Sequence, residues 1–183
     1  MPRDGATMQR SEAEHVLRAA AAIAQEQSFV VVGSQALLFL MPHAPDALLV
    51  SRELDLYPAL HPEKSDLIDG AIGALSSFDT TFGYHADGVG PETAVMPGDW
   101  MQRASLHYVG DLTVICPELH DLALSKCVAA REKDALFVRE LIQRSLIAVA
   151  TLRERAAMLD ADKYPHLAAW IDRRALEAKA PFP

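Results

Sequence analysis

"FVVVGSQALLFL", residues 29–40, is the stretch that decides how this chain folds. The β-branched run before Gly33 is typical of a strand covered on both faces, and the residues after Ser34 suit about two helical turns. A buried strand that passes through Gly-Ser into a helix presents backbone N–H groups at the helix start. This stretch is therefore either an anion-binding turn or a tight turn with Gly33 for backbone freedom and Ser34 as an N-cap.

Composition indicates a folded chain with a substantial core. Half of the 183 residues are hydrophobic, which is enough for one well-buried core of the α/β or α+β class. Neither an internal repeat nor a low-complexity linker interrupts the chain. We therefore predict a single domain over residues 1–183, with an α/β core over 11–117 and a helical part over 118–183.

The charge balance and the hydropathy pattern argue against two classes of function, DNA binding and membrane insertion. The net charge is −8, so non-specific DNA binding is disfavoured. No apolar run reaches the roughly 18 residues of a membrane span, and the first residues carry acids where a leader would be apolar. These features predict a soluble, cytoplasmic protein without membrane partners. Cys116 and Cys127 lack metal-ligand or disulfide spacing and are expected to be buried thiols.

Helical and extended segments alternate along the rest of the chain. A helix is expected over 11–26, capped by Ser11 with Glu14 three residues later. Further helices are expected from Pro62, over 117–144 with a break at 131–133, and over 148–179. The Gly- and Pro-rich middle predicts short strands at 80–86, 104–109 and 112–116.

A pair of acids lies on the strand predicted for "SRELDLYP", residues 51–58. Strand alternation places Glu53 and Asp55 on one face and Leu54 and Leu56 on the other. Neighbouring carboxylates repel each other unless a cation or a proton offsets their charge. Mg²⁺ is bound in this way, by one or two carboxylates together with substrate phosphates. The alternative is a solvated strand face with no ligand.

The combination of these motifs resembles a known superfamily. "VVVGSQALLFL" followed by "SRELDLYP" is similar to the signature of the nucleotidyltransferases related to DNA polymerase beta. "FGYHADGVGPETAVMPGDW" and "HDLALSKCVAAREKDALFVREL" resemble uncharacterised bacterial proteins of that fold, distantly similar to AbiE-type abortive-infection toxins. The resemblance spans about residues 15–145. It implies a small mixed sheet flanked by helices, with a helical C-terminal region.

The resemblance also implies roles for individual residues. Gly33 and Ser34 match the phosphate-holding pair, and Glu53 and Asp55 match the acids that bind Mg²⁺. The superfamily more often has aspartate at the first acid, so Glu53 departs from the pattern. Lys126 and Arg131 match cations that face the triphosphate of an NTP, oriented by an acid at position 134. The alternative for this helical segment is a surface stripe with an ordinary ion pair.

Active transferases of this type usually add a third carboxylate from a later strand, which activates the attacking hydroxyl. The strand predicted over 104–109 contains no acid. The remaining candidates are Asp79, Asp87 and Asp111, of which we favour Asp87 in "YHADGVG".

Three hypotheses follow for the function. The first is an Mg²⁺-dependent transferase that moves NMP from NTP to a protein or RNA acceptor, within a toxin-antitoxin or phage-defence system. The second is a catalytically inactive descendant that senses nucleotide or binds a partner. The third is a structural protein whose acids face solvent. The sequence leaves the nucleotide, the acceptor and any oligomeric state open.

Overall fold

The computed structural model describes residues 7–180, which divide into two compact units. The first unit contains the chain up to Thr93 together with Ala104–Pro117. The second contains Ala94–Arg103 and the chain from Glu118 onward. The boundary predicted between the α/β core and the helical part, at 117/118, coincides with one boundary between the units. The single-domain organisation stays a prediction.

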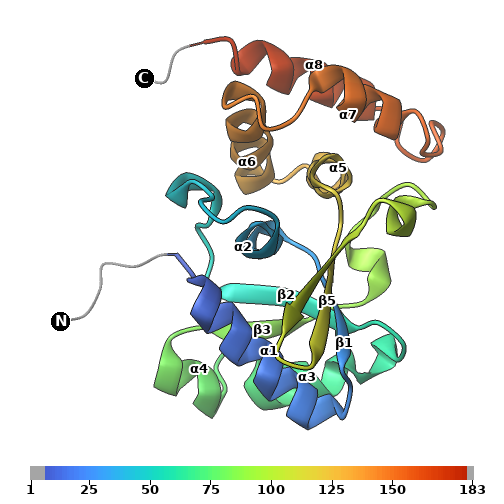
Figure 1. Cartoon of the computed structure of the whole chain (residues 1–183). Helices are drawn as coiled ribbons and strands as arrows, with labels where there is room; N and C mark the ends of the chain where they lie inside the picture. Colours follow the sequence, from blue (N-terminus) through green and yellow to red (C-terminus); the bar gives the residue numbers. More distant parts are fainter. Residues whose placement is uncertain (1–6, 181–183) are drawn as a thin grey trace. The chain divides into compact units, whose positions relative to one another are not determined.

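One five-stranded mixed sheet forms the centre of the first unit (Figure 1). Its strand order is β3-β2-β1-β5-β4. β2 runs antiparallel to β1 but parallel to β3, and β1 runs parallel to β5. The mixed α/β fold is therefore confirmed. The strands are β1 (Ser28–Val31), β2 (Glu53–Pro58), β3 (His85–Gly88), β4 (Ser105–Val109) and β5 (Leu112–Cys116).

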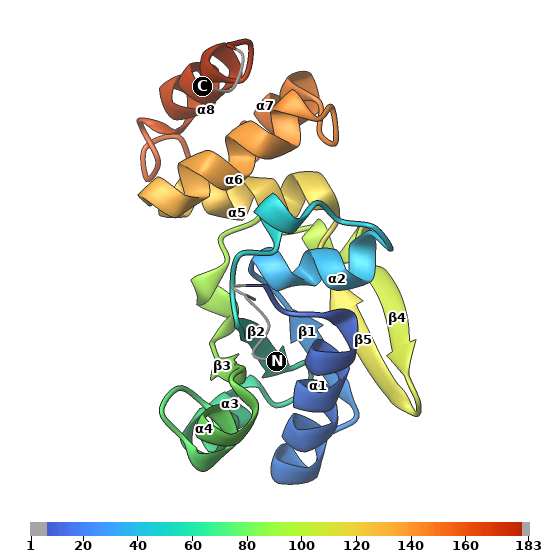
Figure 2. The ribbon, with the colours of Figure 1, turned by 90° about the vertical axis from the view of Figure 1, so that its left-hand side faces the viewer.

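Helices α1 (Arg10–Ala24) and α3 (Ser65–Ile72) pack against each other beside β2 and β3 (Figure 2). The short helices α2 (Leu37–Leu40) and α4 (Ser77–Phe82) complete the first unit. Burial of apolar side chains from the strands and helices drives this packing. The fully buried core of this unit includes Leu17, Phe29, Leu37, Leu54, Leu56 and Ile68.

The start of α1 differs from the expectation. Gln9, not Ser11, is the N-cap residue, and the Glu12 carboxylate accepts the backbone N–H of Gln9 at 2.8 Å. The helix begins earlier because the residue before the cap, Met8, is fixed by a hydrogen bond. Its N–H donates to the carbonyl of Ser51, just before β2, at 3.1 Å. Ser11 consequently lies within the first helical turn, where it is not the cap.

The strand expected over 80–86 was only partly correct, because α4 covers residues 80–82 and only residues 85–86 belong to a strand. The Ser76 hydroxyl accepts the N–H of Asp79 and caps the start of α4. Gly83 ends the helix with φ +72°, the left-handed conformation favoured by glycine. The strand β3 begins only at His85, two residues beyond this C-cap.

Four helices make up most of the second unit (Figure 1). The predicted break near residue 131 is confirmed: the chain turns at Ala130, with φ +53°, and restarts at Arg131. The helices are α5 (Leu119–Ala129), α6 (Glu132–Gln143), α7 (Val149–Ala156) and α8 (Leu167–Glu177). No helix within residues 7–180 has the length and apolarity needed to cross a membrane.

Both cysteines are free and buried, as expected. Burial is the main reason that the pKa of each thiol, Cys116 and Cys127, rises to about 12. The thiols therefore stay protonated at neutral pH and behave as small apolar side chains.

A buried ion cluster holds segment 94–103 to the helices of the second unit. Asp121 on α5 has no exposed side-chain surface and accepts two hydrogen bonds from Arg103, at 2.8 and 3.1 Å. Arg103 also pairs with Asp99 at 2.7 Å, and Arg155 on α7 approaches Asp121 at 3.7 Å. A bidentate guanidinium–carboxylate pair is directional as well as strong. This cluster explains why segment 94–103 belongs with residues that follow position 117.

Replacing Asp121 by asparagine is expected to lower the free energy of unfolding of the second unit by about 1–3 kcal/mol. The reason is that Arg103 would keep its pair with Asp99 but lose its charged hydrogen bonds to Asp121. Both tryptophans, Trp100 and Trp170, lie in this unit, so urea denaturation followed by tryptophan fluorescence measures the loss.

The matched control is Asp172→Asn, which breaks an ion pair with Arg153 whose side chains are each more than half exposed. Its effect should stay below about 1 kcal/mol. Equal losses in the two variants would contradict a special role for the buried cluster.

Candidate functional site

The Gly-Ser turn lies directly beside the strand that carries the acids. The N–H of Val32, just after β1, donates to the carbonyl of Asp55 on β2 at 3.0 Å. The next residue, Gly33, adopts φ +73° and ψ −178°, a conformation that L side chains rarely take. Ser34 then starts a single 3₁₀ turn that leads into α2. The two helical turns expected after Ser34 are thus one 3₁₀ turn and one α-helical turn.

The Asp55 side chain packs against the α-carbon of Gly33. A β-carbon built on Gly33 would lie 2.0 Å from Oδ2 of Asp55, which is far inside van der Waals contact. Glycine is therefore required here for space as well as for its positive φ. The two sequence motifs, 22 positions apart in the chain (55 − 33), meet at this point.

The neighbouring strand β3 brings a further acid to Asp55. In the parallel pairing of β2 with β3, Asp87 is the register partner of Asp55 and His85 is the partner of Glu53. Side chains alternate along both strands, so these four residues share one face of the ladder. The structure therefore places Asp87, the favoured third acid, next to the predicted pair.

Crowding of these acids changes the pKa of Asp87. Burial raises this pKa first, and the negative charge of Glu53 raises it further, whereas a side-chain hydrogen bond with Asp55 partly opposes the rise. A hydrogen bond between two carboxyl groups needs a proton on one of them. The cluster thus favours binding of a proton or a cation at this position.

The donor set suits a hard divalent cation. Within residues 7–180, no three His, Cys, Asp or Glu side chains are arranged as a complete metal-binding group. The acids of β2 and β3 form a partial oxygen set, the kind that Mg²⁺ completes with substrate phosphates and water. Glu53 and Asp55 are the residues that would hold the ion.

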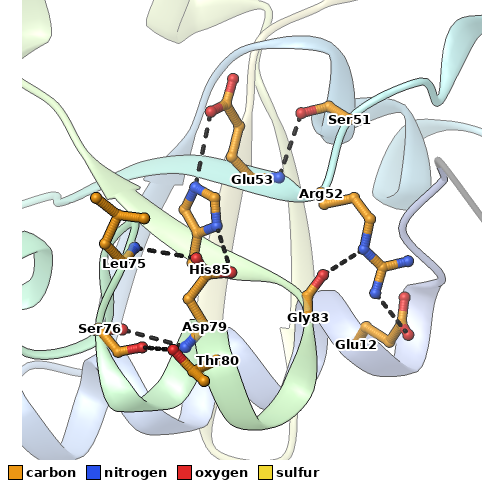
Figure 3. Close-up of polar contacts among 10 residues, drawn as sticks. All are labelled: Glu12, Ser51, Arg52, Glu53, Leu75, Ser76, Asp79, Thr80, Gly83 and His85. Atoms are coloured by element: carbon orange, nitrogen blue, oxygen red, sulfur yellow. Dashed lines mark hydrogen bonds and ion pairs between the residues drawn. The ribbon is translucent and has the colours of Figure 1, made fainter.

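Sequence reasoning missed a second feature of this face, the contact of His85 with two acids (Figure 3). His85 Nδ1 lies 3.1 Å from Oδ1 of Asp79, and its Nε2 lies 3.8 Å from Oε2 of Glu53. The sequence does contain a pattern that could have indicated this contact. Glu53 and Asp55 are two residues apart, and so are His85 and Asp87. That spacing acquires meaning only when the two strands are known to be parallel neighbours.

The other candidates for the third acid lie elsewhere in the first unit. Asp79 belongs to α4, where it bonds to His85 and helps to cap the helix. Asp111 is exposed in the turn between β4 and β5, at the sheet edge opposite β3. Of the three candidates, only Asp87 faces Asp55 across a strand pair.

The predicted basic segment forms a compact cluster within the second unit. Asp134 is buried and accepts a hydrogen bond from Arg131 Nε at 2.7 Å, with Lys126 Nζ at 3.7 Å from its other oxygen. Asp134 also accepts the Arg131 backbone N–H, which caps α6. The Lys126 side chain is 10% exposed and that of Arg131 is 54% exposed. The predicted orientation of both cations by the acid at 134 agrees with these contacts; their binding of nucleotide stays a prediction.

Comparison with known families adds an independent finding. Residues 11–173 match the model of a family described as "Nucleotidyltransferase of unknown function (DUF6036)". The chain belongs to this family. No curated protein and no solved structure matches the chain. The resemblance to nucleotidyltransferases is therefore confirmed, and the similarity to AbiE-type toxins stays a prediction.

The nucleotidyltransferase match covers parts of both units. It contains the Gly33 turn, the acids of β2 and β3, and the basic cluster around Asp134. The family model thus matches nearly all of the described chain, from the second residue of α1 to the middle of α8.

The turn at Gly33 should not tolerate a side chain at this position. Gly33→Ala is expected to lower the free energy of unfolding by about 1–3 kcal/mol, because of the strained φ and the collision with Asp55. Urea denaturation followed by far-ultraviolet circular dichroism measures this change.

Gly70→Ala is the matched control, since a β-carbon on this exposed residue of α3 meets nothing within 4 Å. Alanine within a helix should stabilise the protein by about 0.5–1 kcal/mol. If the two variants shift stability in the same direction, the steric account of Gly33 is wrong.

The acid cluster should make the protein less stable at neutral pH than a variant without it. The raised pKa of Asp87 means that the folded state binds this proton more tightly than the unfolded state. This contribution is therefore present at low pH and is lost as pH rises through that pKa. Asp87→Asn is expected to be more stable than the wild type near neutral pH, with a difference that shrinks in acidic buffer.

Urea denaturation in EDTA-containing buffers over this pH range tests the difference. Asp111→Asn, at an exposed hairpin position, should change stability by less than about 0.5 kcal/mol. A wild type at least as stable as Asp87→Asn at neutral pH would rule out the proposed repulsion.

Proposed function

We propose that the protein is an Mg²⁺-dependent nucleotidyltransferase that moves NMP from NTP to a hydroxyl of a protein or RNA acceptor. The observation that carries the proposal is the meeting of the Gly33 turn with Asp55, which in turn faces Asp87. A phosphate-binding turn and a cation-binding acid are needed side by side for this chemistry. The acceptor, and a place in a toxin-antitoxin or phage-defence system, rest on the resemblance alone.

Binding of the triphosphate is assigned to the turn. The backbone N–H groups that follow Gly33 would donate to phosphate oxygens. The Ser34 hydroxyl, on a half-buried residue, supplies a further donor. Glu53 and Asp55 would hold Mg²⁺, which when bound supplies charge neutralisation on the phosphate oxygens.

Proton transfer is assigned to Asp87. The acceptor hydroxyl oxygen attacks the α-phosphorus, the bond to pyrophosphate breaks, and Asp87 takes the hydroxyl proton. A general base works best when its pKa lies close to the working pH. Burial and the charge of Glu53 move the pKa of Asp87 in that direction.

A catalytically inactive nucleotide sensor is the second candidate. It is favoured by Glu53, which stands where the superfamily more often has aspartate. The extra methylene gives this carboxylate more rotameric freedom than an aspartate has. Such a protein would bind nucleotide without transferring NMP.

Two substitutions separate binding from transfer. With Mg²⁺ and α-labelled NTPs, the wild type should label itself, RNA or another protein. Asp87→Asn should keep nucleotide binding by calorimetry but slow labelling by about 10²–10⁴-fold, because the base is lost. Asp55→Asn should weaken Mg²⁺-dependent nucleotide binding itself.

Asp111→Asn is the control for removal of an acid and should label like the wild type. Nucleotide binding without any labelling would favour the sensor. If Asp55→Asn matched the wild type in both assays, the assignment of the metal site would be wrong.

A further inference from the structure

We propose that Gln35 is a positioning residue, whose side-chain amide holds the turn at Gly33 and Ser34 against the segment that leads into β2. This inference rests on the proposed function, because it assigns the residue that fixes the phosphate-binding turn relative to the acid-bearing strand. Gln35 directly follows Ser34 in the 3₁₀ turn, and it is 1% exposed. A polar side chain enclosed to this degree calls for a physical explanation.

The amide nitrogen of Gln35 contacts two backbone carbonyls of one segment. Nε2 lies 3.0 Å from the carbonyl oxygen of Leu49 and 3.0 Å from that of Ser51. A primary amide carries two N–H hydrogens, so each carbonyl can receive one of them. Because both partners are acceptors, the contacts also identify which end of the amide is the nitrogen. The side chain therefore links the turn to the residues just before β2.

Ser51 continues this link to the first acid. Its hydroxyl accepts the backbone N–H of Glu53 at 3.2 Å (Figure 3). Glu53 is the first residue of β2, and Asp55 follows on the same face of the strand. Two successive hydrogen bonds thus join the side chain of Gln35 to the backbone of the strand that carries both acids.

The turn is fixed to β2 on both of its sides. Before the turn, the N–H of Val32 donates to the carbonyl of Asp55. After the turn, Gln35 donates to the entry of the same strand. Gly33 and Ser34 lie between these two attachments, so the N–H groups assigned to phosphate binding keep a fixed distance from the acids.

The two carbonyls do not need Gln35 to be satisfied. The Leu49 carbonyl also accepts the N–H of Ser51 at 2.7 Å, and the Ser51 carbonyl also accepts the N–H of Met8 at 3.1 Å. At the other end of the amide, Oε1 of Gln35 is buried and has no hydrogen-bond donor among residues 7–180. A buried acceptor of this kind lowers stability. Gln35 is therefore better explained by the geometry that it maintains than by stability.

The first test uses the wild type without metal or nucleotide. The Nε2 hydrogens of Gln35 should exchange with solvent at least about 10-fold more slowly than those of the exposed Gln102, because they are buried and hydrogen-bonded. The side-chain amide signals in ¹H–¹⁵N spectra measure both rates. Equal rates would overturn the inference, whether or not any variant folds.

The second test replaces Gln35 by methionine, which is similar in length but lacks the amide. Gln35→Met should keep its urea midpoint close to that of the wild type, because both carbonyls retain a donor and the unpaired acceptor is gone. It should nevertheless weaken Mg²⁺-dependent binding of a non-hydrolysable NTP analogue, measured by calorimetry, by about 10–100-fold. The reason is that the turn loses its attachment to the entry of β2.

Val109→Ala is the control for a change in a buried side chain of the same unit. Val109 lies on β4, which β1 and β5 separate from β2, so this variant should bind the analogue like the wild type. If Asp55→Asn weakens binding but Gln35→Met binds as tightly as Val109→Ala, the positioning role is wrong and the proposed function stands. If the wild type fails to bind the analogue with Mg²⁺, the proposed function falls, and the inference falls with it.

Discussion

The contact between the Asp55 carboxylate and the α-carbon of Gly33 is the constraint on which the candidate site depends. It joins the end of one strand to the middle of its neighbour, so the turn and the acid cannot move independently. The antiparallel pairing of β1 with β2 sets this approach, and the backbone bond from Val32 to Asp55 reinforces it. Glycine is thus required at position 33 by the fold itself.

Local chemistry made part of the site predictable from sequence. Gly33, Ser34, Glu53 and Asp55 lie in two short motifs whose meaning depends on turn geometry and strand alternation, both of which are local. Asp87 could be named only as one of three candidates, because its distance to Asp55 depends on strand register. The contact between His85 and Asp79 was not predicted, because it requires the β2–β3 pairing and the position of α4 together.

The fold shows the same division between local and non-local information. The break between α5 and α6 was predicted, since acids and a change of pattern mark it in the sequence. The second half of α4, residues 80–82, was predicted as strand, whereas the Ser76 cap and the Gly83 turn mark the two ends of a helix there. The association of segment 94–103 with the second unit depends on the bidentate Arg103–Asp121 pair. No local sequence pattern predicts an ion pair between residues so far apart in the chain.

The parallel direction of β2 and β3 has a consequence for how this chain can vary in length. Parallel neighbours need a long crossover, and here residues 59–84, with α3 and α4, provide it. Insertions in the exposed parts of that crossover leave the ladder intact. Loss of a single residue at the start of β3 would exchange the faces of the strand, so that Ala86 and Gly88 would replace His85 and Asp87 beside the acids. A change of length is therefore compatible with the ladder in the crossover but not inside β3.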